Sequence, residues 1–68
     1  MEPIWRRIRV IAYTLYLLRD EHVIAAETFE APDDVAATEA AQARRLDLAS
    51  ELWCGDRLVA FIAAADGR

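Results

Sequence analysis

The scarcity of cross-linking residues limits how this chain can stabilise a fold. Its 68 residues include one cysteine, Cys54, and one histidine, His22. A disulfide within the chain and a zinc site made of cysteine and histidine ligands from one chain are therefore both excluded. A domain of this length buries only about 60% of its unfolded surface, and such domains usually need a disulfide, a metal or a partner. We therefore expect the chain to associate with itself, as a homodimer, or to dock on a larger protein complex.

The charge distribution argues against general binding of nucleic acid. The net charge is −4, and every basic residue is an arginine. A protein that grips phosphates needs a basic patch, which an acidic chain lacks overall. The arginines nevertheless crowd near the start, at Arg6, Arg7 and Arg9, beside Trp5. Tryptophan and arginine suit both nucleic acid and anionic membrane surfaces, so an anion-binding N-terminus is our alternative hypothesis.

The first apolar stretch does not predict a signal peptide or a membrane span. It runs from Val10 to Leu18 and is followed by Arg19, Asp20 and Glu21 instead of a cleavage site of small residues. A transmembrane helix needs about 20 apolar residues, which this stretch does not provide. We therefore expect a cytoplasmic protein.

The first half of the chain predicts an antiparallel hairpin. Residues 4–18 fit a helical stripe as well as a strand, but Tyr13, Thr14 and Tyr16 are among the β-branched and aromatic residues that favour strands. We predict a strand from Arg9 to Leu18 and a second from His22 to Glu30, with a short polar turn between them. Residues 1–8 are then an N-terminal arm or an extension of the first strand.

The sequence Ala31-Pro32-Asp33-Asp34 predicts the start of a helix. Proline disfavours helix in the residue before it, and either aspartate can cap the free N–H groups of a first turn. The alanine-rich segment from Val35 to Leu46 is then predicted to be helical, with arginines in its last turn. The apolar face expected for this helix consists of Val35, Ala36, Ala40, Ala43 and Leu46.

The second half predicts another hairpin, with strands from Ala49 to Cys54 and from Arg57 to Ala63. Glycine first in the two-residue loop Gly55-Asp56 is typical of a type II′ turn. This turn places Cys54 opposite Arg57. The pairing then continues with Trp53 opposite Leu58 and Leu52 opposite Val59. One face of the hairpin is then expected to carry Trp53, Leu58, Ala60 and Ile62, and the other Leu52, Val59 and Phe61.

Together these elements predict an α+β fold, a ββαββ domain over residues 9–63 with a loose tail at 64–68. One alanine-rich helix covers only one face of a four-stranded sheet, so an apolar second face must be covered otherwise. We predict that this face is a protein interface, made by Trp53, Leu58, Ala60, Ile62, Tyr16 and Trp5. The alternative is that the N-terminal arm, with Ile4, Trp5 and Ile8, folds over it.

The two hairpins and the helix together resemble a group of short, uncharacterised bacterial proteins. The resemblance covers about residues 13–62 and is carried by Tyr13-Thr14-Leu15-Tyr16-Leu17-Leu18, His22-Val23-Ile24-Ala25-Ala26-Glu27, Asp33-Asp34 and Glu51-Leu52-Trp53-Cys54-Gly55-Asp56-Arg57-Leu58-Val59-Ala60. Two departures are the missing glycine in the first turn and the extension at residues 1–12. The group has no assigned activity, so the resemblance implies the fold and no function.

Candidate catalytic and metal-binding groups are few, and each has a simpler interpretation. His22 with Asp20 and Glu21 forms a polar turn whose consecutive positions cannot converge on one ion. Cys54, predicted to lie opposite Arg57, lacks a second cysteine or histidine to complete a nucleophilic pair. Four carboxylates could form a cation site: Asp33, Asp34, Glu27 and Glu30. Capping of the helix start already explains the two aspartates, so we prefer that interpretation. We therefore predict no catalytic residue, cofactor or metal, and a protein that is not an enzyme.

Overall fold

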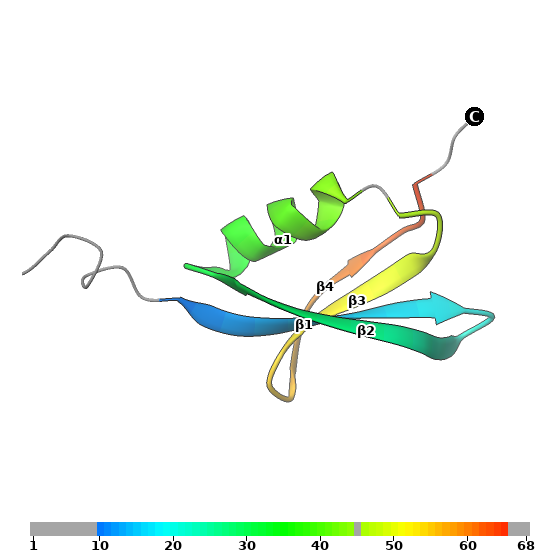
Figure 1. The fold of residues 1–68 in the computed structure, drawn as a ribbon, viewed down its shortest axis with the longest axis horizontal. Helices are drawn as coiled ribbons and strands as arrows, with labels where there is room; N and C mark the ends of the chain where they lie inside the picture. The colour runs from blue at the N-terminus through cyan, green and yellow to red at the C-terminus, as the bar shows by residue number, and fades with distance from the viewer. Residues whose placement is uncertain (1–9, 45, 66–68) are drawn as a thin grey trace, which may run out of the picture.

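The computed structural model describes residues 10–44 and 46–65, which form an antiparallel sheet and one helix. The elements are β1 (Ile11–Arg19), β2 (His22–Ala31), α1 (Asp34–Ala43), β3 (Ala49–Cys54) and β4 (Arg57–Ile62). The strand order in the sheet is β2-β1-β3-β4, and α1 lies on one side of it (Figure 1). The predicted α+β fold and its ββαββ order are confirmed. The predicted N-terminal arm lies outside the described residues.

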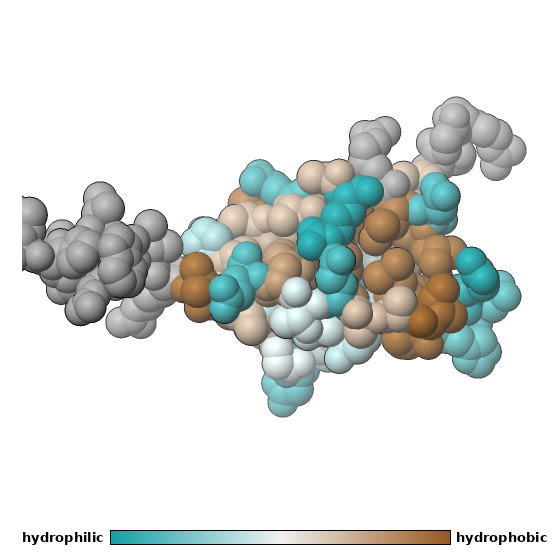
Figure 2. Space-filling model, in the orientation of Figure 1, coloured by the Kyte–Doolittle hydropathy of each residue, from teal (hydrophilic) through white to brown (hydrophobic). Residues whose placement is uncertain are grey.

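The first hairpin turns tightly without glycine. Asp20 and Glu21 have φ angles of 51° and 67°, the left-handed values that a type I′ turn requires at both central positions. The pairing shifts between Leu17, which lies opposite Ala25, and Leu18, which lies opposite Val23, so Ile24 is an extra residue. Figure 2 shows hydrophobic side chains exposed towards this end of the hairpin, with hydrophilic ones at its tip. Val23 and Ile24 are 57% and 49% exposed there.

Helix α1 begins where the sequence predicts and ends earlier. The side chain of Asp33 accepts a hydrogen bond of 2.8 Å from the N–H of Ala36, which makes it the N-cap. The helix ends at Ala43, short of the predicted Leu46, and Arg44 is the C-cap. The side chain of Arg44 pairs with Glu27 on β2, so this cation fastens the end of the helix to the sheet.

The predicted apolar face of α1 was only partly right: Ala36 and Leu46 pack against the core as expected, but Val35 and Ala43 are exposed. Val35 is 67% exposed, whereas Ala37 and Ala41 are the buried residues of the helix. These two positions are four residues apart and so lie on one side of the helix. Alanine at both lets the helix approach the sheet closely, although each methyl group buries little area.

The second hairpin differs from its predicted register by one residue. Gly55 has a φ of 61° and Asp56 a negative φ, as in the predicted type II′ turn. Cys54 pairs with Arg57 and Trp53 with Leu58, as predicted, but Leu52 pairs with Ala60. Val59 is therefore the extra residue of a β-bulge. Because neighbouring residues of a strand point to opposite faces, the bulge exchanges the faces of all later residues of β4.

The core is small and lies between α1 and the sheet. Among the described residues, Tyr13, Leu15 and Leu52 are the large apolar side chains with no exposed surface. The alanines Ala31, Ala37 and Ala41 complete the buried cluster. Phe29 packs against its edge, with its ring centroid 6.1 Å from that of Tyr13. So few large buried side chains indicate a marginal stability for the isolated domain.

The chain after β4 remains attached to the fold for at least three residues. The N–H of Ala65 donates a 2.7 Å hydrogen bond to the carbonyl of Leu46. The tail predicted to be loose from residue 64 is therefore held at Ala65, and the last three residues lie outside the described part of the chain.

Candidate functional site

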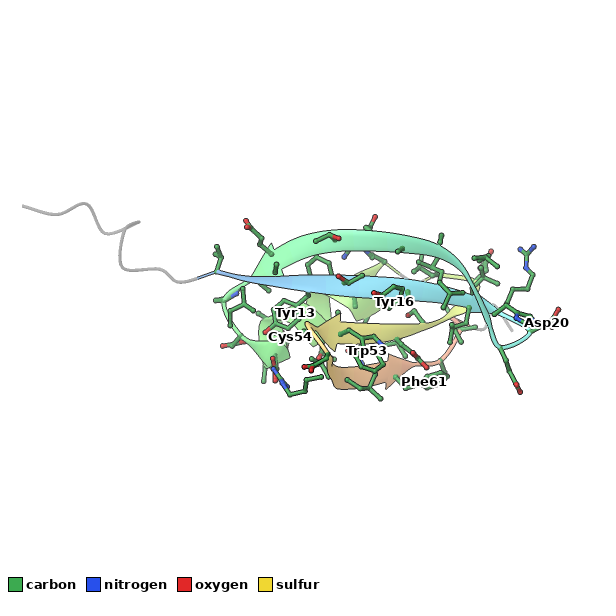
Figure 3. The ribbon with its side chains drawn as sticks, turned by 90° about the horizontal axis from the view of Figure 1, so that it is seen from below. Tyr13, Tyr16, Asp20, Trp53, Cys54 and Phe61 are labelled. Carbon is green, nitrogen blue, oxygen red and sulfur yellow. The ribbon has the colours of Figure 1, made fainter. Side chains whose placement is uncertain are left out.

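The face of the sheet opposite α1 carries two rows of side chains. Directly paired residues of antiparallel strands point to the same face. Tyr16 pairs with Glu51, which pairs with Phe61, and these three form the first row. The second row consists of Thr14, Trp53 and Leu58, which pair in the same way. We call these six residues the open face. Figure 3 views it directly, with Tyr16, Trp53 and Phe61 in front of the strands.

The open face is apolar and accessible. Phe61 is 60% exposed and Leu58 is 49% exposed, while Tyr16 and Trp53 are half-buried. Within residues 10–44 and 46–65, no element covers this side of the sheet (Figure 1). Exposed aromatic and aliphatic side chains that gather on one face are typical of a protein interface.

A shallow cleft of about 360 Å³ opens on the same face. Tyr16, Val23, Glu51, Trp53, Gly55 and Asp56 line it. The indole Nε1–H of Trp53 donates a 3.0 Å hydrogen bond to Oε1 of Glu51, which holds this carboxylate against the aromatic ring. The cleft thus combines two aromatic side chains with two carboxylates, an arrangement that suits a cationic group.

A cluster of polar side chains fastens the start of α1 to the sheet on the other face. The hydroxyl of Tyr13 donates to Oδ1 of Asp34 at 2.7 Å, and Arg57 donates to both oxygens of the same carboxylate at 2.9 and 3.2 Å. Arg57 first and Tyr13 second hold the pKa of Asp34 below its ordinary value, and the carboxylate in turn raises the pKa of Arg57. The hydrogen bond to Asp34 and then burial raise the pKa of Tyr13 to about 12. These contacts hold the start of the helix against the sheet.

The carboxylates considered as cation ligands are engaged elsewhere. Asp33 caps α1, Asp34 binds Tyr13 and Arg57, and Glu27 pairs with Arg44. Across the described ranges, no three histidine, cysteine, aspartate or glutamate side chains converge as metal ligands would.

The remaining sequence candidates are separate from one another. His22 is exposed at the end of the first hairpin, opposite Arg19. Cys54 is half-buried against the core, and its cross-strand neighbour Arg57 is bound to Asp34. No arrangement of a thiol with a base is formed by these residues.

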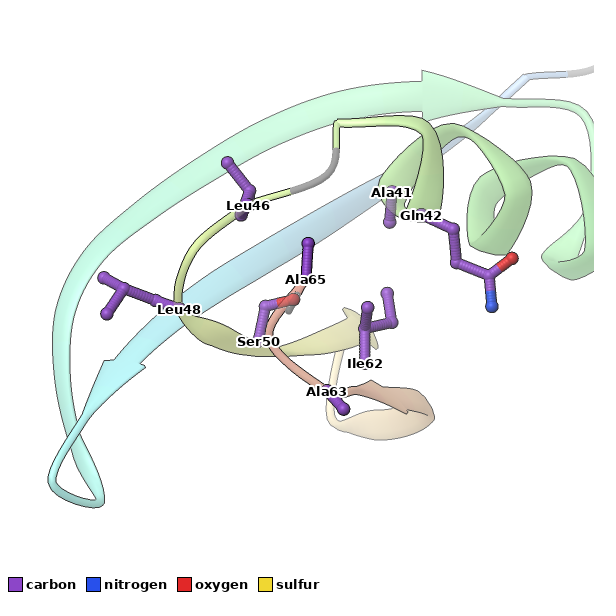
Figure 4. A pocket seen from close by; sticks show the side chains of 8 residues that line it. All are labelled: Ala41, Gln42, Leu46, Leu48, Ser50, Ile62, Ala63 and Ala65. Carbon is purple, nitrogen blue, oxygen red and sulfur yellow. The ribbon is translucent and has the colours of Figure 1, made fainter. Parts of the chain in front are cut away.

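A second pocket, of about 310 Å³, lies beside the end of α1 (Figure 4). Its lining consists of Ala41, Gln42, Leu46, Leu48, Ser50, Ile62, Ala63 and Ala65. Ser50 and Gln42 are the polar side chains in this set, and none of its members titrates near neutral pH. The pocket therefore offers shape and a few hydrogen bonds, but no acid, base or charge.

The structure brings together only part of the interface predicted from the sequence. Tyr16, Trp53 and Leu58 lie together on the open face, as the sequence predicted. Ala60 and Ile62 do not, because the bulge at Val59 turns them towards the helix, where they pack against the core. The same bulge places Phe61 on the open face, which sequence reasoning missed. Trp5, Arg6, Arg7 and Arg9 lie outside the described residues, so the anion-binding alternative stays a prediction.

Comparison with protein-family models, with curated proteins and with solved structures gave no match. Helix α1 spans ten residues, and none of the described helical structure is long and apolar enough to cross a membrane.

Proposed function

We propose that this chain is a small, non-catalytic interaction domain that associates with a second copy of itself through the open face. The observation that supports this proposal is the pair of cross-strand rows, with Tyr16, Trp53, Leu58 and Phe61 gathered on a side that no described element covers. Tyrosine and tryptophan are the residues that most often dominate binding energy at protein interfaces.

The small core gives a thermodynamic reason for association. The described part of the chain buries three large apolar side chains completely, and about half of the surface of Leu58 and Phe61 remains in water. Burial of apolar surface contributes about 25 cal/mol per Å², so covering the open face adds stabilisation that the helix side does not supply. A second copy provides a matching apolar face, as a two-fold dimer requires.

A larger protein complex is the other partner that could cover this face. Its docking would be favoured by the same burial of exposed apolar side chains. We place either interaction in the cytoplasm as part of this proposal. Neither version assigns a reaction to the chain, since the residues with perturbed pKa values hold the helix to the sheet.

Native mass measured by light scattering after size exclusion tests this proposal. We expect a mass above that of the 7.7 kDa chain, and a melting temperature that rises over about a hundredfold increase in concentration, because association stabilises only the folded state. A monomer whose melting temperature does not change over this range contradicts self-association. Retention by another protein of the source cell would then assign the face to a larger complex.

A further inference from the structure

The cleft on the open face has a charge that its own sheet does not balance. Glu51 is the central residue of the first row, held by the Trp53 indole, and Asp56 also lines the cleft. Within residues 10–44 and 46–65, two arginines form salt bridges, Arg44 with Glu27 and Arg57 with Asp34. Arg57 belongs to the cluster at the start of α1, on the opposite side of the sheet from Glu51. A carboxylate that is covered by an apolar partner surface needs a cation or a hydrogen-bond donor from that partner.

One segment of the chain has the chemistry that complements this cleft. Residues 4–9, Ile-Trp-Arg-Arg-Ile-Arg, contain three of the eight basic residues of the protein together with three large apolar side chains. A guanidinium group binds carboxylates with fixed geometry and also stacks on aromatic rings, so arginine matches Glu51 between Tyr16 and Trp53. The isoleucines and Trp5 match the neighbouring Leu58 and Phe61.

We propose that the open-face cleft binds an arginine from residues 4–9 of a second copy, with the two copies exchanging these segments. This inference rests on the proposed self-association and names the contact that orients it. Six extended residues span about 20 Å, which exceeds the width of about 14 Å across four strands. The segment is therefore long enough to reach the cleft from the edge of the partner's sheet.

Binding to the same copy is disfavoured by the sequence that joins the segment to β1. To reach its own sheet, the chain would have to reverse direction just before Ile11. Residues 4–10 contain no glycine, proline, asparagine, aspartate or serine, and Ile8 and Val10 are β-branched. Such residues favour extended chain over a tight turn. A segment that continued β1 in extended form would lead away from its own sheet and towards a second molecule.

The first test uses charge substitutions in the full chain. We expect Glu51→Gln with Asp56→Asn to weaken the dimer about tenfold at low salt, since charged hydrogen bonds contribute more than neutral ones. Arg6→Gln, Arg7→Gln and Arg9→Gln combined should have a similar effect, and all five substitutions together should weaken it no further than either set alone. The matched control is Glu39→Gln with Asp47→Asn, which removes two exposed acidic charges, one on α1 and one in the loop before β3, and should leave the dimer unchanged. Sedimentation equilibrium at about 0.05 M and about 0.5 M NaCl provides the dissociation constants, and the wild-type dimer should weaken as salt screens the pair.

The second test locates the segment directly. A nitroxide label is attached at Glu2→Cys in a Cys54→Ala background, and this protein is mixed with an equal amount of ¹⁵N-labelled wild-type chain. Broadening of the amide signals of Tyr16, Trp53 and Phe61 in the ¹⁵N-labelled copy is the expected result. If a dimer forms without this broadening, the exchange of segments is overturned and self-association stands. The same holds if broadening appears only in a sample whose chains each carry both the label and ¹⁵N, because the segment then contacts its own copy. A chain that stays monomeric at every concentration overturns both proposals.

Discussion

Replacing Phe61 by alanine separates the stability of the domain from the stability of its assembly. Phe61 is 60% exposed on the open face. A phenylalanine presents about 200 Å² of surface, so about 120 Å² per copy remains to be covered by a partner. At about 25 cal/mol per Å² this area corresponds to about 3 kcal/mol per copy and about 6 kcal/mol per two-fold dimer. Part of such a gain is offset by the ordering of side chains on association. We therefore expect the dimer dissociation constant to rise by at least about a hundredfold.

The assay needs both an assembly measurement and a stability measurement. Sedimentation equilibrium over a range of concentrations gives the dissociation constant, and urea unfolding at a concentration that favours monomer gives the free energy of unfolding. The latter should change by no more than about 0.5 kcal/mol, because an exposed side chain away from the core contributes little. Val35→Ala is the matched control, since Val35 is 67% exposed on the outer side of α1. It should alter neither quantity.

Two results would refute this reasoning. If Phe61→Ala dimerises as tightly as wild type, the open face is not the surface that associates. If the variant instead loses several kcal/mol as a monomer, Phe61 is packed within its own chain and is not available to a partner.

Three further predictions concern the fold. Leu52→Ala removes a side chain with no exposed surface and should lower the free energy of unfolding by about 2–5 kcal/mol, measured with urea. Asp20→Asn with Glu21→Gly relieves two left-handed residues with φ of 51° and 67° and should raise stability by about 1 kcal/mol or more, seen as a higher melting temperature. The pKa of Tyr13 rises on folding from 10.0 to about 12, so its contribution is complete below pH 10 and is lost as the pH rises through about 12. Circular dichroism should show alkaline destabilisation over this window, and Tyr13→Phe should remove this component; unchanged alkaline unfolding in the variant would argue against it.

The sequence was sufficient to predict the element types because strong local signals agree. The run of β-branched and aromatic residues around Tyr13 predicts a strand, the aspartates after Pro32 predict a helix start, and Gly55 predicts a hairpin turn. Each of these features acts within a few residues of chain. The structure confirmed all three.

The sequence was not sufficient where a position depends on contacts between distant residues. Alanine occurs all around α1, so periodicity could not show that Ala37 and Ala41 face the sheet in place of Val35. The bulge at Val59 leaves no local sign, since β-branched residues suit regular strands equally well. Part of the predicted interface was therefore assigned to the wrong face, although the open face itself was expected from one helix and four strands.

The first turn shows a different limit. Aspartate suits the first left-handed position of this turn, but Glu21 is an unusual residue for the second, and a glycine there would have identified the turn type. The antiparallel pairing of β1 with β2 over almost their whole length fixes the turn from both sides. Long-range pairing thus imposes on Glu21 a conformation that its local preference disfavours.

The two bulges also determine where this chain could change length during evolution. Ile24 and Val59 each stand opposite no residue of the neighbouring strand. Deleting either one restores continuous pairing and keeps every later side chain on its present face, at the cost of that residue's own packing. A deletion elsewhere in a strand, such as at Leu15, would transfer buried positions to water. Single-residue gaps between relatives of this protein should therefore fall at positions 24 and 59, inside strands, where gaps are ordinarily least expected.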